Sequence, residues 1–284
     1  MLGTSAWAIL FKNMKNILII SDSVGMGNIA SSAMMPILAY MGFSTSSLPT
    51  CLVSNNFGYG KYAILDTTGY LREAFPIWEK LGFGFDAIAT GFIPSEEQAE
   101  LISQFCAAQA AKGASIFVDP VMGDCGEFYD GLDTDMVVRS MRKMLSVADL
   151  CYPNYTEACL LTGIPYKEEG VSEKGIFEIV DAIREMGAKS VVITSAKVDG
   201  RNAVAGHKAA TGEKFLLYYE ELPLFFSGTG DVFSAVLIGY LMKGESLKHS
   251  TRKAMDGVYN FMLLNKDAKD PYKGLPVEKY LNVL

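Results

Sequence analysis

The stretch that most constrains the fold runs from Ser227 to Gly244 and reads SGTGDVFSAVLIGYLMKG. A glycine-rich turn is followed by side chains that are apolar on nearly every side, which predicts a buried central helix. The N-terminus of such a helix presents unpaired N–H groups and the positive end of the helix dipole, so it can bind an anion. Asp231 in the first turn is favoured as a carboxylate and could act as a general base beside a bound phosphate. Glycine turns and first-turn acids also begin many helices that bind nothing, so the stretch needs support from elsewhere in the chain.

Short apolar runs alternate with helical stretches along most of the chain. The runs at 16–20 (NILII), 114–118 (ASIFV) and 189–193 (KSVVI) are typical of strands buried on both faces. Near the C-terminal third, 203–205 and 214–219 predict an antiparallel extension of the same sheet. The pattern therefore predicts an α/β fold with one mainly parallel sheet and helices on both faces.

Composition narrows the class of protein. The chain has 284 residues and a net charge of −7, with no basic stripe, which argues against nucleic acid as a partner. No apolar run is long enough to span a membrane. The five cysteines are odd in number and widely spaced without a C-x-x-C pair, which indicates reduced thiols in a cytoplasmic protein. We predict a single domain over residues 14–284, preceded by an extension at 1–13 whose basic residues follow its apolar run, unlike those of a signal peptide.

Polar residues follow several of the predicted strands, at the edge where open α/β sheets bind ligands. Asp119 and Asp124 flank a proline-containing turn after the strand at 114–118, and one or two such carboxylates with phosphate oxygens and water suit Mg²⁺. Asn154 and Glu157 open a helix after another strand. The plainer interpretations are a solvated acidic turn and an ordinary first-turn helix acid.

Two glycine-containing loops add alternatives. Residues 25–30 read GMGNIA, a G-x-G-x-x-A match that would suit a nicotinamide-dependent oxidoreductase. The acid expected about 20 residues later is missing from the strand at 47–53, which weakens this interpretation. Residues 54–60 form a polar, aromatic and glycine-rich loop that could flex over a ligand or be a surface turn.

The order of these motifs resembles the ribokinase-like superfamily of small-molecule kinases. The segments NILIISDS, CLVSNNFGYG, VDPVMGD, PNYTEA, VVITS and GTGD follow one another as in its pyridoxal/pyridoxamine kinase branch, and the likeness runs from about Lys15 to about Gly244. The resemblance implies a three-layer αβα sandwich. It also implies ATP-dependent phosphorylation of the 5′-hydroxymethyl group of a vitamin B6 vitamer (pyridoxal, pyridoxamine or pyridoxine), with Mg²⁺, commonly a monovalent ion such as K⁺, and a homodimer.

The resemblance also assigns roles to particular residues. Asp231 resembles the catalytic base of the family. The other matches are an anion hole at Gly228, Thr229 and Gly230, a nucleotide-phosphate region at Asp119, Asp124, Asn154, Glu157, Thr194 and Ser195, and metal contacts from Asp119, Asp124 and Glu157.

The substrate side departs from better-known members of that branch. The matching positions are Ser21, Asp22, Ser23, Asn55, Phe57 and Phe92. Phe57 and Phe92 stand where threonine and tyrosine are common, so hydroxyls near the ring are lost, and such a loss can change discrimination between analogues. The alternatives are a hydroxymethylpyrimidine kinase, the oxidoreductase, and a non-catalytic B6- or nucleotide-binding regulator. The intact Asp231 argues against the last of these.

Overall fold

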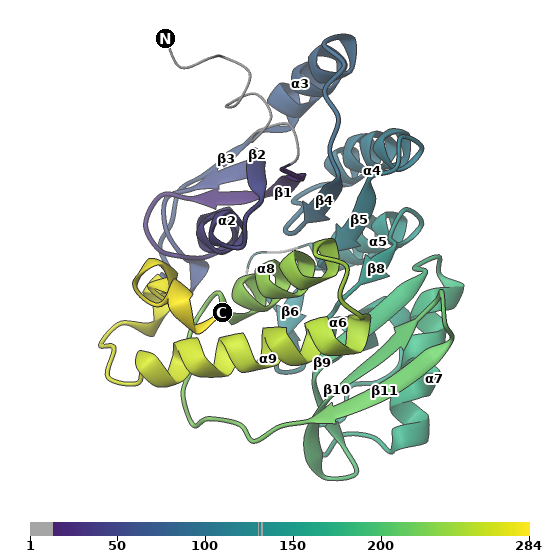
Figure 1. Cartoon of the computed structure of the whole chain (residues 1–284), viewed down its shortest axis with the longest axis vertical. Helices are drawn as coiled ribbons and strands as arrows, with labels where there is room; N and C mark the ends of the chain where they lie inside the picture. The colour runs from purple at the N-terminus through teal and green to yellow at the C-terminus, as the bar shows by residue number, and fades with distance from the viewer. Residues whose placement is uncertain (1–13, 130, 132) are drawn as a thin grey trace, which may run out of the picture.

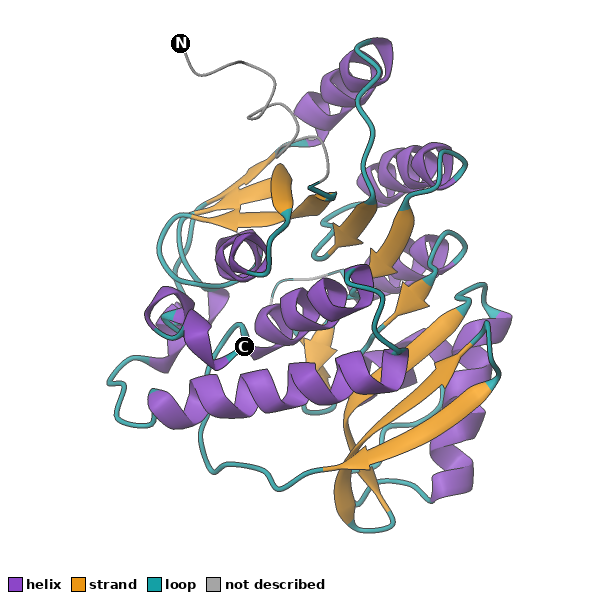
Figure 2. Cartoon of the chain, in the orientation of Figure 1, coloured by secondary structure: helices purple, strands orange, loops and turns teal. Residues whose placement is uncertain are grey.

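A computed structural model describes residues 14–129, 131 and 133–284, so the predicted extension at 1–13 lies outside the described residues. Nine strands form one twisted sheet (Figures 1 and 2). From edge to edge its order is β11 (Glu213–Tyr218), β10 (Arg201–Lys208), β9 (Ser190–Val198), β8 (Leu150–Cys151), β5 (Ser115–Val118), β4 (Ala87–Thr90), β1 (Asn16–Val24), β2 (Ser44–Val53) and β3 (Ile64–Asp66). The six strands from β9 to β2 in this order run parallel, and β3, β10 and β11 extend the sheet antiparallel at its two edges.

Helices cover both faces of the sheet. One face carries α2 (Ser31–Tyr40), α8 (Thr229–Met242) and α9 (Leu247–Leu264), and α8 and α9 lie side by side in front of the sheet in Figure 1. The other face carries α3 (Thr68–Lys80), α4 (Glu96–Ala110), α5 (Thr134–Leu145), α6 (Tyr155–Thr162) and α7 (Glu173–Glu185). A small hairpin of β6 (Gly123–Asp124) and β7 (Glu127–Phe128) stands apart from the sheet. The predicted three-layer αβα sandwich is confirmed.

The apolar run NILII explains why two layers of helices are needed. Ile17 and Ile19 of β1 point into the core beneath α8, while Leu18 and Ile20 point into the core beneath α4. All four side chains are fully buried. Because successive side chains of a strand face opposite sides, a continuous apolar run demands cover on both faces.

Two sequence predictions needed correction. The strand predicted at 189–193 is part of a longer strand, β9, which continues to Val198 because the antiparallel strand β10 pairs with it between Val191 and Val198. The sequence after Gly244 predicts amphipathic helices up to the C-terminus. The structure has one long helix there, α9, followed by the short 3-10 turns η2 (Pro271–Lys273), η3 (Val277–Lys279) and η4 (Leu281–Val283).

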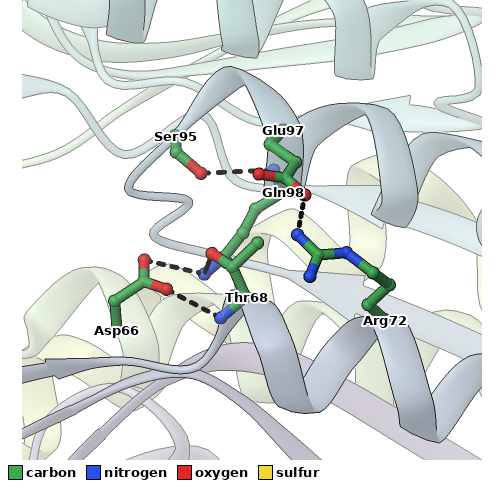
Figure 3. Close-up of polar contacts among 6 residues, drawn as sticks. All are labelled: Asp66, Thr68, Arg72, Ser95, Glu97 and Gln98. Atoms are coloured by element: carbon green, nitrogen blue, oxygen red, sulfur yellow. Dashed lines mark hydrogen bonds and ion pairs between the residues drawn. The ribbon is translucent and has the colours of Figure 1, made fainter.

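A buried glutamine joins β2, α3 and α4. Gln98 is fully buried, and its Nε2 donates to the Thr50 carbonyl oxygen at 2.8 Å and to Thr68 Oγ1 at 3.0 Å. The spacing of Ser95 and Gln98 in the sequence predicts a capping box at the start of α4, and Ser95 does cap this helix by accepting from the Gln98 N–H (Figure 3). The Gln98 side chain does not complete a capping box, because it is used in this network. The sequence predicts a helix over 71–81, and the structure starts this helix, α3, three residues earlier, where Asp66 accepts from the N–H of Thr68.

Candidate active site

The N-terminus of α8 opens beside the carboxyl ends of the parallel strands. Gly228 is the N-cap of this helix, with φ at +81°. A Cβ on Gly228 would lie 2.9 Å from Ile29 Cγ2 and 3.0 Å from the Asn28 carbonyl oxygen, so only glycine fits this turn. The first-turn N–H groups of a helix have no intrahelical partner. Gly230 is exposed, which leaves this helix end open to an anionic group.

Asp231 does not behave as an ordinary first-turn acid. Its side chain makes no capping bond to its own helix. Instead, its Oδ2 accepts from the backbone N–H of Ala30, the N-cap of α2, at 2.7 Å. Ala30 has a φ of +52°, a conformation that non-glycine residues rarely adopt and that often marks functional sites. Asp231 is therefore held between the N-termini of two helices.

Burial raises the pKa of Asp231 to about 8, and the nearby Asp22 and Asp119 carboxylates act in the same direction. The hydrogen bond from Ala30 opposes this shift. A carboxylate with a pKa near neutrality is suited to take a proton from a substrate hydroxyl and to release it again.

The glycines of the GMGNIA loop serve packing rather than a pyrophosphate. The Gly25 N–H donates to the Val53 carbonyl oxygen at 2.8 Å, and Gly27, with a φ of +124°, lies against the backbone of Lys273. The loop thereby places the Ala30 N–H at Asp231. The glycines of this motif thus help to shape the backbone that contacts Asp231.

Asp119 lies at the end of β5, facing α8. Its Oδ2 is 3.2 Å from Ser234 Oγ, and the same hydroxyl is 2.8 Å from the Gly230 carbonyl oxygen. Burial raises the pKa of Asp119 to about 7, and the Ser234 hydroxyl opposes that shift. Sequence analysis missed Ser234, although a serine one turn after Gly230 on an otherwise apolar helix is a recognisable signal.

Asn154 and Glu157 form a complete capping box at the start of α6. Asn154 Oδ1 accepts from the Glu157 N–H at 2.8 Å, and Glu157 Oε2 accepts from the Asn154 N–H at 2.9 Å. Glu157 Oε1 also accepts from the Met122 N–H at 3.1 Å, and Asn154 Nδ2 donates to the Gly123 carbonyl oxygen at 2.8 Å. Glu157 is therefore a first-turn acid of α6 whose carboxylate is also held by the turn after β5. The box also ties the turn containing Asp124 to this end of β8.

Carboxylates gather here without basic partners. The pKa values of Asp22, Asp119, Asp124, Glu157 and Asp231 are all raised, in each case mainly by burial. The Asp119 and Asp124 charges raise the pKa of Glu157 further, and no lysine or arginine of the described chain contributes to any of these shifts. Such a cluster favours a bound cation, which would supply the missing positive charge.

Within the described residues, no group of three His, Cys, Asp or Glu side chains could hold a metal by itself. Mg²⁺ does not need such a group, because it binds one or two carboxylates together with phosphate oxygens and water. One or two of the acids Asp119, Asp124 and Glu157 would be enough for such a site, with phosphate oxygens and water as the other ligands.

The other nucleotide-side candidates lie close to this capping box. The Thr194 N–H donates to the Pro153 carbonyl oxygen at 2.9 Å, and Thr194 forms a bridge with Asn154. Ser195 is exposed and has a φ of +54°. The antiparallel pairing of β9 is irregular opposite this residue, so Ser195 marks a break within the strand.

The substrate-side candidates surround a small apolar cluster. Phe92 is buried with Val24 and Val53, and the Phe57 ring lies 6.2 Å from the Phe92 ring. Ser21 Oγ donates to Asp22 Oδ1 at 3.0 Å, which holds this acid beside the cluster. The substrate-side candidates thus bring the aromatic rings of Phe57 and Phe92 into one cluster, with the Asp22 carboxylate near Cys51 of the same cluster.

Ser23 and Asn55 make weaker candidates. Ser23 lies half-buried in β1 opposite Leu52. The Asn55 Nδ2 donates to the Lys61 carbonyl oxygen at 2.8 Å, and its Oδ1 accepts from Ser54 Oγ at 2.6 Å. Asn55 therefore holds its own loop together in this conformation.

This sequence and structure are similar to those of known small-molecule kinases. The sequence profile of the Phosphomethylpyrimidine kinase family matches residues 43–271. The chain belongs to the phosphomethylpyrimidine kinase family. This confirms the likeness to ribokinase-like kinases that the motifs indicate.

Several family members are similar over nearly the whole chain. A pyridoxal kinase of Corynebacterium diphtheriae is 27% identical over 257 residues, covering 87% of this chain and 88% of the relative. The crystal structure of a putative phosphomethylpyrimidine kinase from Bacteroides thetaiotaomicron, in a form with pyridoxal, is 31% identical with a TM-score of 0.89, covering 95% and 96% of the two chains. The pyridoxal kinase of Lactobacillus plantarum is 28% identical with a TM-score of 0.83 and the same coverage. In the described part of the chain, no helix has the length and apolar character needed to cross a membrane.

Proposed function

We propose that this chain transfers a phosphoryl group from ATP to the 5′-hydroxymethyl group of a vitamin B6 vitamer: pyridoxal, pyridoxamine or pyridoxine. The observation that carries the proposal is the position of Asp231, held by the Ala30 N–H beside the open glycine turn of α8. The pyridoxal kinases among the relatives, and the related Bacteroides structure with pyridoxal, support the choice of substrate.

In this mechanism Asp231 orients the substrate hydroxyl and takes its proton. The N–H groups of the turn at Gly228, Thr229 and Gly230, with the positive end of α8, stabilise the charge that develops on the transferring phosphoryl group. Phosphoryl transfer depends on positioning and charge neutralisation rather than on covalent chemistry by the protein, and this turn supplies both.

Asp119, Asp124 and Glu157 would hold Mg²⁺ together with the nucleotide phosphates, near Asn154, Thr194 and Ser195. The ion, when bound, neutralises phosphate charge. A monovalent ion such as K⁺ could add further positive charge beside the same carboxylates. The support for both ions is the cluster of acids with raised pKa values and no basic partner.

For the base of the nucleotide we propose the open hollow, about 420 Å³ in volume, lined by residues Glu221–Phe225. This segment is mostly apolar and leads directly into Ser227 and the glycine turn. A planar base lying there would have its phosphates directed toward the start of α8.

A hydroxymethylpyrimidine kinase is the second candidate. The family description favours it, and so do the aromatic side chains of Phe57 and Phe92, which offer stacking surface without a hydroxyl. Both candidates use the same phosphoryl machinery and differ only in the ring that is bound.

The test is product formation with Mg-ATP and K⁺ across pyridoxal, pyridoxamine, pyridoxine and hydroxymethylpyrimidine, with Asp231→Ala as the control. We expect a B6 vitamer to be the preferred substrate and the variant to lose on the order of 10²-fold or more in kcat. Preference for the pyrimidine would establish the second candidate. ATP binding without any product would favour a non-catalytic regulator, and NAD binding instead of ATP would favour an oxidoreductase.

We also propose a homodimer formed through the β3 edge of the sheet. Leu52, Ile64 and Leu65 are 44%, 49% and 62% exposed there, and β3 is the last strand of the sheet. An exposed apolar edge strand invites pairing with another chain, and a second copy would cover it. Light scattering should give twice the chain mass for the wild type and the monomer mass for Leu65→Asp. A monomeric wild type would overturn the proposal.

A cytoplasmic location is proposed on the cysteines. Cys51, Cys106, Cys125, Cys151 and Cys159 are all free thiols. Unpaired thiols persist in reducing compartments. Fractionation of the source cells would test this proposal, and recovery in an oxidising compartment would contradict it.

A further inference from the structure

The chain after α9 turns back across the site. We call residues 270–275 the C-terminal clasp, and Figure 1 shows this yellow end of the chain beside α2 and the start of α8. The Ser227 N–H donates to the Pro271 carbonyl oxygen at 3.1 Å, next to the glycine turn. The Asn28 N–H donates to the Lys273 carbonyl oxygen at 2.7 Å, two residues before Ala30. The clasp thus contacts both loops that hold Asp231 in place.

The clasp also holds the loop at residues 54–60. Asn56 Nδ2 donates to the Tyr272 carbonyl oxygen at 3.0 Å, and the Tyr59 hydroxyl donates to Asp270 Oδ2 at 2.7 Å. The Tyr59 and Tyr272 rings are 5.5 Å apart. A Cβ on Gly58 would lie 2.5 Å from the Tyr272 ring, so the loop and the clasp are in close contact.

A third contact reaches the nucleotide side. The Tyr272 ring packs edge-on against Phe225, with ring centroids 5.8 Å apart. Phe225 belongs to the hollow proposed for the base, and its side chain is 61% exposed. Tyr272 therefore lies between the loop of the vitamer pocket and the segment of the nucleotide hollow.

The hydrogen bond between Tyr59 and Asp270 is linked to the position of the Phe57 ring through one short turn. Phe57 and Tyr59 are the two ends of the single 3-10 turn η1, so they move together. Phe57 in turn packs on Phe92 in the apolar cluster. A shift of Tyr59 away from Asp270 would therefore move the Phe57 ring, whereas Asp231 keeps its separate bond to Ala30.

We propose that the clasp is a positioning element of the active site, in which Asp270 and Tyr272 fix the loop at 54–60 and thereby set the affinity for the vitamer. This inference rests on the proposed function. Tyr59, Asp270 and Tyr272 are positioning residues, because they act on the substrate through Phe57. Their loss should weaken vitamer binding and leave the phosphoryl-transfer step nearly unchanged.

The test compares Tyr59→Phe, Asp270→Ala and the double variant with the wild type. Each single change removes one hydrogen bond, whose typical worth corresponds to a change of about three- to tenfold. We expect the KM for the vitamer to rise by that factor, with kcat within about twofold and the KM for Mg-ATP unchanged. The double variant should match the single ones, because all three lack the same bond. Tyr70→Phe is the control, since Tyr70 is an exposed residue of α3 whose hydroxyl makes no hydrogen bond within the described chain.

A second readout does not depend on activity. Lys61 lies at the end of the same loop, and its carbonyl oxygen accepts from Asn55 Nδ2. Trypsin should therefore cut after Lys61 faster in Tyr59→Phe than in the wild type or Tyr70→Phe, with the site identified by mass spectrometry. Unchanged cutting and an unchanged KM would overturn the clasp, as would a fall in kcat with KM unchanged. If the wild type phosphorylates no vitamer, the proposed function fails, and the trypsin comparison still decides whether the clasp holds the loop.

Discussion

Replacing Asp231 with asparagine should make the protein more stable and less active at the same time. Asparagine keeps the shape of the side chain and an oxygen that can accept from the Ala30 N–H. It removes the charge, and with it the ability to take a proton. Loss of a positioned base lowers kcat by roughly 10²- to 10⁴-fold, equivalent to about 3 to 5.5 kcal/mol in the barrier.

The gain in stability follows from the raised pKa. Burial raises the pKa of Asp231 from 3.8 to about 8, so the folded state keeps its proton where the unfolded chain has released it. The free energy of unfolding therefore falls as the pH rises from about 4 to about 8. At pH 7 the full pKa shift would lower it by about 4 kcal/mol. The carboxylate keeps partial contact with solvent. We therefore expect the Asp231→Asn variant to gain about half of that free energy, which corresponds to a rise in Tm of roughly 4 to 8 °C for a chain of this size.

The assay is thermal unfolding of both proteins between pH 4 and pH 9, beside steady-state kinetics. The difference in Tm should be near zero at pH 4 and grow up to about pH 8. Asp135→Asn is the control, since Asp135 is an exposed first-turn acid of α5, and its loss should lower stability by a few tenths of a kcal/mol. An Asp231→Asn variant that is less stable than the wild type at pH 7, or that keeps its activity, would refute the reasoning.

Three further substitutions test other parts of the site and the fold. Gly228→Ala should lower the free energy of unfolding by about 2 kcal/mol and kcat by at least about tenfold, because Gly228 has a positive φ and close neighbours. Gly244→Ala is its control: Gly244 has a φ of +94° and open space around it, so kcat should stay unchanged. Gln98→Ala should lower the free energy of unfolding by about 1 to 3 kcal/mol in urea titrations, because a buried carbonyl of β2 loses its donor, while kcat stays within twofold. Ser234→Ala removes a donor to Asp119, so the pKa of Asp119 should rise above about 7 and the Mg²⁺ requirement near pH 6 should increase by about threefold, with little change at pH 9. An unchanged pH profile would separate Ser234 from the metal site.

The layers of the fold could be predicted because their signal is local. The apolar residues of the run at 16–20 and of the helix after Asp231 predict by themselves that these segments are buried, and both are buried in the structure. Strand ends were less predictable where pairing decides them. β9 continues past Ser195 because β10 lies beside it, and no property of the segment itself reveals that partner.

The site could be predicted only in part, for a similar reason. Asp231 and the glycine turn are next to one another in the sequence, so their chemistry can be read directly. Ala30 contributes through a backbone N–H, and backbone groups carry no sequence signal. The positive φ of Ala30 depends on the residues packed around it, and an alanine at this position gives no sign of it in the sequence. The same holds for the clasp, whose contacts come mostly from carbonyl oxygens.

The hydrogen bond between Ala30 and Asp231 joins residues 201 positions apart. During synthesis the first strand and α2 leave the ribosome long before α8 is made, so Asp231 meets the Ala30 N–H only when the late helix docks on the early one. Catalytic competence should therefore arise in one late step of folding. A chain released before α8 could complete much of the sheet and still have no active site.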